Sequence, residues 1–150
     1  MASSVKMIKK VISIQERTKR KLSGILSADV VEYSRLMEED EAYTIQCLGE
    51  NQKLIGEIIE EYKGRVVDAP GDNILAEFSS VVNAVECAVN VQNILQAKNS
   101  HLLENSRMYL RIGVNLGDVV DEDGRIYGDG ITGKNGPSSA QHNLNRRPAF

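Results

Sequence analysis

The stretch "RVVDAPGDNILAEF", residues 65–78, decides the fold of this chain. Two short, largely apolar runs, 65–68 and 74–78, flank a Pro-Gly-Asp-Asn segment. Pro and Gly favour tight turns, and the flanking runs have the length and composition of strands. We therefore predict a β-hairpin with its turn at 69–73.

Helical patterns lie on both sides of this hairpin. Apolar residues recur at helical spacing over 41–62, and Lys63-Gly64 ends that pattern. A second helix is predicted over about 80–97, where Ser79-Ser80 provides the N-cap. The hairpin thus connects two long helices.

Further outward, two more strands are predicted. Residues 22–30 form an apolar run, and residues 108–120 alternate polar and apolar side chains, with Arg111 among the polar ones. A short helix with Ser34 as its N-cap is expected to reach about residue 39. The Asp-Gly pair within 121–125 indicates a turn.

The resulting order is strand, helix, strand, strand, helix, strand. This order is that of the ferredoxin-like βαββαβ arrangement. We predict an α+β fold with an antiparallel sheet in the order 4-1-3-2 and its helices on one face.

Composition indicates one soluble domain. The chain has 150 residues with ordinary apolar and charged fractions, and no apolar run approaches the roughly 20 residues that span a bilayer. The two cysteines, Cys47 and Cys87, have neither CxxC spacing nor a neighbouring histidine. We expect reduced thiols and a cytoplasmic protein.

The first 20 residues are expected to form a basic lead-in outside the domain. Residues 1–21 carry seven Lys or Arg and one Glu, so the rest of the chain holds the acidic excess. A basic amphipathic start is compatible with an anionic membrane, nucleic acid or a targeting peptide. We favour a solvated lead-in or short linker helix and expect no nucleic-acid partner.

Two carboxylates are expected to meet in this fold. Asp29 ends the first strand, and Asp72 lies on the hairpin turn beside the start of the third strand. The 4-1-3-2 order brings these two strand ends together. Two adjacent anions repel, and a divalent cation such as Mg²⁺ or Mn²⁺ resolves the conflict. The alternative is that Asp72 is a turn residue and Asp29 a helix cap.

Three segments resemble the catalytic domain of class III nucleotidyl cyclases, the adenylate and guanylate cyclases of bacterial type. They are "LSGILSADVVEYSRLM", "GRVVDAPGDNILAEFSSVVNAVECAVNVQ" and "RIGVNLGDVVDEDGRIYGDGI". The similarity covers about residues 21–131. It implies conversion of ATP, or less favourably GTP, to a 3′,5′-cyclic nucleotide and pyrophosphate at a two-metal site, in intracellular signalling.

The resemblance also implies roles for particular residues. Asp29 and Asp72 match the catalytic, metal-binding aspartates, and the Val30 carbonyl is an expected further metal ligand. The phosphate-binding loop consists of Val31, Glu32, Tyr33 and Ser34. The active sites of the family form between two catalytic domains, so we expect a homodimer or a cyclase-type partner domain.

Several positions depart from the family pattern. Glu32 replaces the usual glycine of the loop, and the base-recognition positions hold Asp68 and Arg125 in place of Lys and of Asp or Thr. Thr132 and Gly136 stand where the family has Asn and Arg, and residues 132–150 have the composition of a disordered tail that ends the domain early.

These departures predict weak or absent activity for this chain. The alternative function is a non-catalytic dimerisation or nucleotide-sensing module on the same fold. Diguanylate cyclases and polymerase palm domains share the βαββαβ plan, but their hairpin reads Gly-Gly-(Asp/Glu)-Glu-Phe or similar, whereas this one reads Pro-Gly-Asp-Asn.

Overall fold

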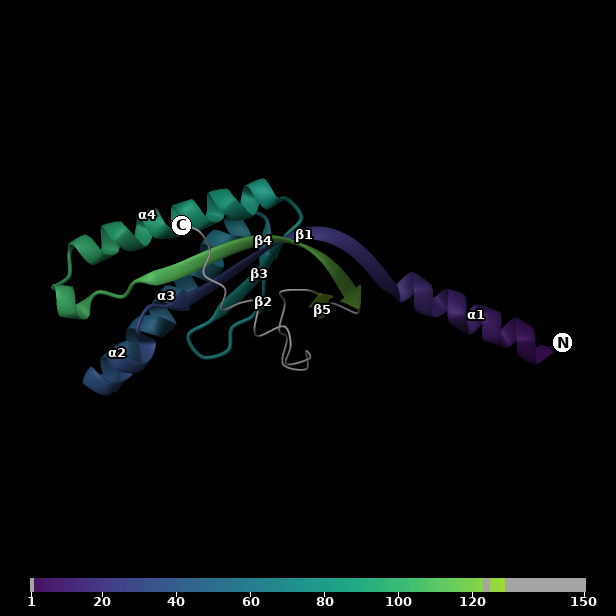
Figure 1. Ribbon diagram of the computed structural model, residues 1–150, viewed down its shortest axis with the longest axis horizontal. Helices are drawn as coiled ribbons and strands as arrows, with labels where there is room; N and C mark the ends of the chain where they lie inside the picture. The colour runs from purple at the N-terminus through teal and green to yellow at the C-terminus, as the bar shows by residue number, and fades with distance from the viewer. Residues whose placement is uncertain (1, 123–124, 129–150) are drawn as a thin grey trace.

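An antiparallel sheet organises the part of the chain that the structure, a computed structural model, describes: residues 2–122 and 125–128. Figure 1 shows the elements in chain order. They are α1 (Ala2–Arg17), β1 (Thr18–Val30), α2 (Tyr33–Glu39), α3 (Glu41–Glu61), β2 (Gly64–Asp68), β3 (Ile74–Phe78), α4 (Val81–Ser100), the 3-10 turn η1 (Glu104–Ser106), β4 (Leu110–Glu122) and β5 (Arg125–Gly128). The predicted α+β class is confirmed.

The sheet has the strand order β2-β3-β1-β4-β5 within the described residues. β1 is central and pairs with β3, placing Ala28 opposite Ile74, and with β4, placing Asp29 opposite Arg111. The first four strands have the predicted order. β5 was not predicted, because a four-residue edge strand carries little periodic signal. It pairs Arg125 with Glu122, so β4 extends into the predicted turn.

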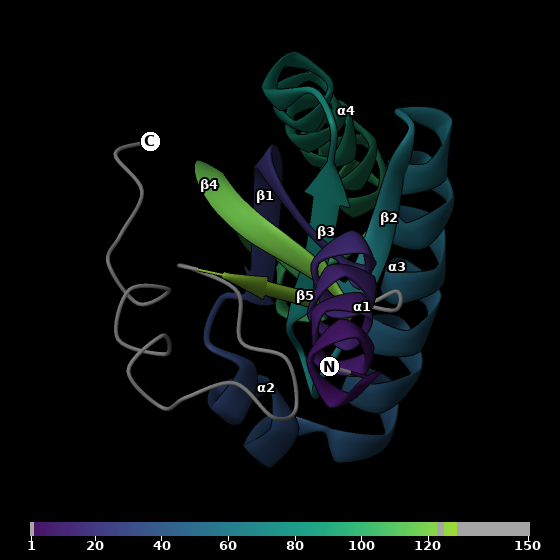
Figure 2. The same cartoon turned by 90° about the vertical axis from the view of Figure 1, so that its right-hand side faces the viewer.

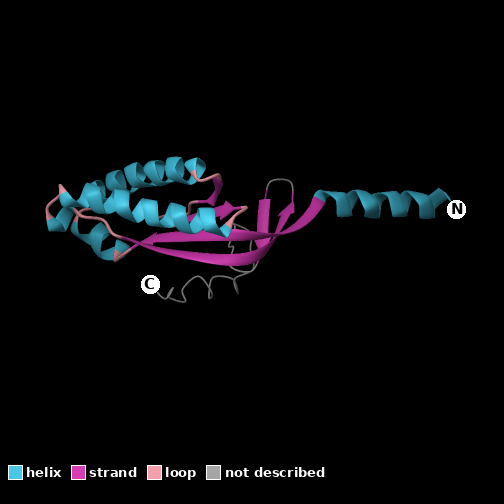
Figure 3. Cartoon of the chain, turned by 90° about the horizontal axis from the view of Figure 1, so that it is seen from above, coloured by secondary structure: helices cyan, strands magenta, loops and turns pink. Residues whose placement is uncertain are grey.

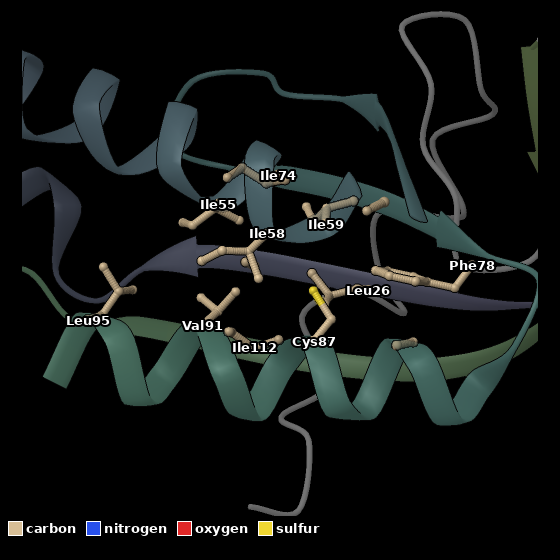
Figure 4. Packing of buried hydrophobic residues seen from close by; sticks show 13 residues of the cluster. Leu26, Ile55, Ile58, Ile59, Ile74, Phe78, Cys87, Val91, Leu95 and Ile112 are labelled. Carbon is tan, nitrogen blue, oxygen red and sulfur yellow. The ribbon is translucent and has the colours of Figure 1, made fainter. Parts of the chain in front are cut away.

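The long helices α3 and α4 cover one face of the sheet, as Figure 3 shows from above and Figure 2 from the end. Their apolar sides meet alternate residues of the strands in one core. Figure 4 shows Ile55 and Ile59 of α3 and Val91 of α4 against Leu26 of β1. All four side chains are buried. At roughly 1.5–3 kcal/mol for each such side chain, this layer supplies much of the stability.

The other face of the sheet carries the remaining alternate residues. Ile25, Leu75 and Val119 form a small buried cluster there. Asp29 belongs to this face as well, because its neighbours Ala28 and Val30 pack on the helix-covered side. Helices α3 and α4 therefore cover one face of the sheet, and Asp29 lies on the other face.

Two helix ends differ from the sequence-based prediction. Ser34 is not an N-cap: α2 begins at Tyr33, and Glu32 is the N-cap residue, with no side-chain capping bond. At the end of α3, Lys63 rather than Gly64 adopts the left-handed conformation, with φ 61°. Gly64 serves a different purpose, since a Cβ there would lie 2.4 Å from the ring of Phe78.

The basic start of the chain forms α1, which Figures 1 and 3 show extending away from the sheet. β1 begins at Thr18, four residues before the predicted start, so it crosses the predicted domain boundary at residue 20. No described helix has the length and apolar character needed to cross a membrane. Thr132, Gly136 and the rest of the predicted tail lie outside the described residues.

Candidate active site at the end of the central strand

Asp29 lies near the C-terminal end of the central strand β1, on the face of the sheet away from the helices. The strand is fixed by pairing on both sides and by the burial of its neighbours Ala28 and Val30. The Asp29 side chain is 32% exposed. A partly buried carboxylate of this kind requires a partner.

A tight turn positions Asp72. The N–H of Asn73 donates to the carbonyl of Pro70 at 3.0 Å, and Gly71, at the first central position, has φ 60°. A positive φ there matches the type II′ turn of hairpins and favours glycine. From α3, the Gln52 side-chain amide donates to the Gly71 carbonyl at 2.9 Å, which anchors the turn.

The structure brings Asp72 to Asp29 through the backbone. The N–H of Val30 donates to Asp72 Oδ2 at 3.2 Å, across 42 positions of sequence. Because Val30 directly follows Asp29, the two carboxylates lie at one end of β1. Their predicted proximity follows from the sheet order, and their roles stay predictions.

Arg111 is the residue that sequence reasoning missed. Its Nε donates to Asp29 Oδ1 at 2.8 Å from the directly opposite position on β4. The hydrogen bond and charge of Asp29 raise the pKa of Arg111, and the charge of Asp72 raises it further. The signal was available in the sequence, because Arg111 alternates with apolar residues on a strand predicted to pair with β1.

The donor set suits a hard divalent cation. Two carboxylates and a backbone carbonyl, that of Val30, are oxygen ligands of the kind that Mg²⁺ or Mn²⁺ takes, with phosphate oxygens completing the shell. Among the described residues, no group of three or more His, Cys, Asp or Glu side chains is placed to hold a metal ion. An ion held by Asp29, Asp72 and the Val30 carbonyl would therefore need further oxygen ligands from outside this set.

The predicted phosphate-binding loop is a tight turn between β1 and α2. Val31 donates its N–H to the carbonyl of Tyr109 at 2.9 Å, so that amide is already used. Tyr33 packs with Val30 in a small apolar cluster. Ser34 is exposed in the first turn of α2. The backbone amides that the loop can offer to an anion therefore start at Glu32.

Glu32 occupies the left-handed region, with φ 55° and ψ 38°. This is the conformation that the glycine of the family pattern adopts without strain. The Glu32 side chain is exposed, and its Oε2 accepts from Arg35 Nε at 3.2 Å and Nη2 at 2.9 Å. Arg35 lies on α2 and also donates from Nη1 to Glu39 Oε1 at 2.7 Å, so two carboxylates share its charge.

A cavity of about 440 Å³ adjoins this loop. Its lining residues carry charges of both signs and come from the loop, α2 and the segment before β4: Val31, Glu32, Arg35, Leu36, Glu104, Asn105, Arg107 and Tyr109. Neither aspartate is among these lining residues. The cavity is therefore distinct from the Asp29–Asp72 pair.

The two base-recognition positions lie far apart. Asp68 ends β2 and Arg125 begins β5, and these are the two edge strands of the described sheet. Three strands separate them, which corresponds to roughly 19 Å at the usual strand spacing. The Asp68 carboxylate accepts a hydrogen bond from Ala69 N–H at 2.9 Å. One chain does not bring the two together.

A second charged cluster surrounds Glu77 on the same face of the sheet. The Glu77 side chain is only 4% exposed. It accepts hydrogen bonds from Ser23 Oγ and Arg65 Nε, each at 2.8 Å, and forms an ion pair with Lys21 Nζ at 2.8 Å. Burial raises the pKa of Glu77, but the three donors together outweigh it and hold the pKa below its ordinary value. This cluster joins three neighbouring strands.

Known proteins share this sequence and fold, although no protein-family model matches the chain. A curated protein of Rhizobium meliloti (strain 1021), "Putative adenylate cyclase 3", is 46% identical over 118 residues, which are 78% of this chain and 20% of that protein. The crystal structure of an adenylate/guanylate cyclase/hydrolase from Silicibacter pomeroyi is 37% identical, with a TM-score of 0.68, covering 75% of this chain and 66% of that chain.

The guanylyl cyclase Cya2 adds support for the fold alone. Its crystal structure has a TM-score of 0.60 at 22% identity and covers 77% of this chain and 66% of that chain. Sheet order, placement of the aspartates and these similarities agree. The chain carries a class III nucleotidyl cyclase domain and spans about one fifth of the length of the curated relative.

Proposed function

We propose that this domain converts a nucleoside triphosphate, ATP in preference to GTP, to a 3′,5′-cyclic nucleotide and pyrophosphate with the help of Mg²⁺ or Mn²⁺. In this reaction the 3′-oxygen forms a bond to the α-phosphorus and its proton is lost. The bond from the α-phosphorus to the oxygen bridging to the β-phosphorus breaks, and pyrophosphate leaves. The preference for ATP rests on the name of the curated relative.

The observation that carries this proposal is the hydrogen bond from Val30 N–H to Asp72 Oδ2, which holds Asp72 next to Asp29. In the proposed site, Asp29, Asp72 and the Val30 carbonyl hold the ions, and both carboxylates are fixed before substrate arrives. Ions held there would lower the pKa of the 3′-hydroxyl and neutralise charge on the triphosphate. In the proposed site, loop amides from Glu32 onward bind phosphate oxygens.

A second chain completes the proposed site. Asp68 and Arg125 lie on opposite edge strands, so recognition of a base by both requires one residue from each of two copies. A homodimer related by a two-fold axis supplies this combination twice. The double substitution Asp68→Arg with Arg125→Asp keeps one acidic and one basic side chain at these two positions. It exchanges which position carries which charge.

The test is a cyclase assay with ATP and with GTP in Mn²⁺, together with titration calorimetry using Mn²⁺ and a non-hydrolysable ATP analogue. Asp29→Asn and Asp72→Asn remove a charge with little change in shape and are expected to abolish turnover and Mn²⁺ binding. Asp118→Asn, an exposed carboxylate elsewhere on β4, is the matched control. Turnover that survives in both site variants would contradict the proposal.

A non-catalytic nucleotide-sensing module is the second candidate. The observation that favours it is Glu32, a charged residue held in a strained backbone conformation where the family pattern has glycine. Under this alternative, the ATP analogue binds with Mn²⁺ and depends on Asp29 and Asp72, while no cyclic nucleotide forms. Product formation by the unmodified chain would exclude it.

A further inference from the structure

The Asp29–Asp72 pair already has a cation of its own. Arg111 lies directly opposite Asp29 in the β1–β4 ladder, and its Nε donates to Asp29 Oδ1 at 2.8 Å. The charge of Asp72 also acts on Arg111. Two carboxylates and one guanidinium therefore share this end of the sheet and leave one net negative charge.

The backbone of Arg111 is fixed, whereas its side chain is not buried. Its neighbours Leu110 and Ile112 pack in the core on the helix-covered face, so the strand cannot shift without loss of packing. The Arg111 side chain is 63% exposed on the other face, against 32% for Asp29. An exposed arginine in a single ion pair gives up its position at small energetic cost.

A divalent cation at Asp29 meets this guanidinium directly. The cation requires Asp29 as a ligand, and the guanidinium requires it as a hydrogen-bond acceptor. Both groups are positively charged, so they repel each other at the short distance that separates two groups on one carboxylate. Asp72 differs, because its Oδ2 accepts from a neutral backbone N–H of Val30. The competition is therefore confined to Asp29.

We propose that Arg111 is the resident counter-ion of the Asp29–Asp72 pair, that a divalent metal has to displace it from Asp29, and that Arg111 thereby sets the metal affinity of the site. This inference rests on the proposed metal site and adds a positioning residue to it. Arg111 stabilises the metal-free carboxylates and weakens metal binding.

The experiment measures Mn²⁺ binding to the whole chain without nucleotide, from the signal of free Mn²⁺ in electron paramagnetic resonance. Arg111→Gln removes the charge and is expected to tighten Mn²⁺ binding about fivefold, the upper end of what an exposed ion pair contributes. Arg111→Lys restores the charge and is expected to return affinity toward that of the unmodified chain. Arg111→Met is the second neutral variant, and thermal unfolding verifies that each variant is folded.

Arg20→Gln is the matched control for net charge. Arg20 Nε on β1 lies 3.6 Å from Asp118 Oδ2 on β4, and Arg20 is close to the end of β1 opposite to Asp29. Its loss is expected to change Mn²⁺ affinity less than about twofold, because exposed charges that far away are screened by salt. An equal gain in Arg20→Gln and Arg111→Gln would overturn the inference.

The remaining outcomes separate this inference from the proposed function. If Asp29→Asn abolishes Mn²⁺ binding and Arg111→Gln tightens it, the proposed metal site and the role of Arg111 are both supported. Both are also supported if only Arg111→Gln binds Mn²⁺ and the added Asp29→Asn change removes that binding. Binding that needs Asp29 but is unchanged or weakened in Arg111→Gln and Arg111→Met overturns the role of Arg111 and leaves the metal site intact. No binding in any of these proteins overturns both.

Discussion

Arg35 holds the carboxylate of Glu32 through two of its nitrogens, while the Glu32 backbone stays in the left-handed region. The ion pair is exposed, so solvent and salt weaken it. The backbone conformation costs a non-glycine residue about 1–2 kcal/mol. The loop after β1 thus carries backbone strain that this exposed ion pair does little to offset.

Glu32→Gly is expected to be more stable than Glu32→Ala by about 1 kcal/mol, because both lose the ion pair and only glycine relieves the strain. Urea unfolding of the two variants measures the difference. Glu32→Gln, which keeps the backbone strain and removes the charge, is the control. Equal stability of the Gly and Ala variants would show that the left-handed conformation is absent in solution.

Gly71→Ala is expected to destabilise the chain by about 1 kcal/mol and to weaken Mn²⁺ binding, because φ 60° at this position of the turn is unfavourable for alanine and the turn presents Asp72. Gly49 lies inside α3, where a Cβ meets nothing within 4 Å. Gly49→Ala is therefore expected to stabilise by about 0.5–1 kcal/mol and to leave Mn²⁺ binding unchanged. The same sign for both changes would argue against the turn geometry.

Glu77→Gln is expected to cost about 2 kcal/mol at pH 7, since Lys21 and Arg65 lose their shared anion while both remain partly exposed. The pKa of Glu77 is lower in the folded chain than in the unfolded one. The contribution of ionised Glu77 to the free energy of unfolding is therefore complete above about pH 5. It is lost as the pH falls below about 4.3, the ordinary pKa of Glu in an unfolded chain, toward the lower pKa of the folded chain.

Unfolding free energies between pH 3 and 7 test this linkage. The difference between the unmodified chain and Glu77→Gln is expected to shrink as the pH falls below about 5. Glu57→Gln, an exposed carboxylate on α3, serves as the comparison. A difference that stays constant across the range would mean that Glu77 has the same pKa in the folded and the unfolded chain, which would contradict the linkage.

The thiol of Cys87 is expected to be inert in the folded chain. Burial raises its pKa to about 11, so about one molecule in a thousand carries the thiolate at pH 8. Cys47 is also buried, and burial raises its pKa too. A disulfide reagent should therefore react slowly in buffer and rapidly with both thiols in urea. Fast reaction of the native chain would place a thiol at the surface.

The sequence was informative where periodicity and turn chemistry agree. The hairpin at 65–78 and the flanking helices determine the order of the sheet, and the order alone brings Asp72 to the end of β1. Short elements were harder, because a seven-residue helix or a four-residue strand has little periodic pattern to read. The start of α2 at Tyr33 and the strand β5 belong to this group.

The two aspartates of the candidate site were predictable from the sequence, whereas the arginine that pairs with Asp29 was not. Asp29 and Asp72 stand out because a carboxylate beside an apolar run demands an explanation. Arg111 looks like any exposed strand residue until the β1–β4 register is known, since one step along the strand would move it to the other face. Pairing register is a property of the whole sheet and not of a local sequence.

The register that places Asp29 also protects the fold from error. A shift of β1 by one residue would turn Asp29 toward the apolar layer beneath α3 and α4 and bring Val30 to the opposite face. Burial of an unpaired carboxylate there would be costly. Asp29 therefore helps to fix the register of β1, because a chain paired one residue out of register would bury this carboxylate without a partner.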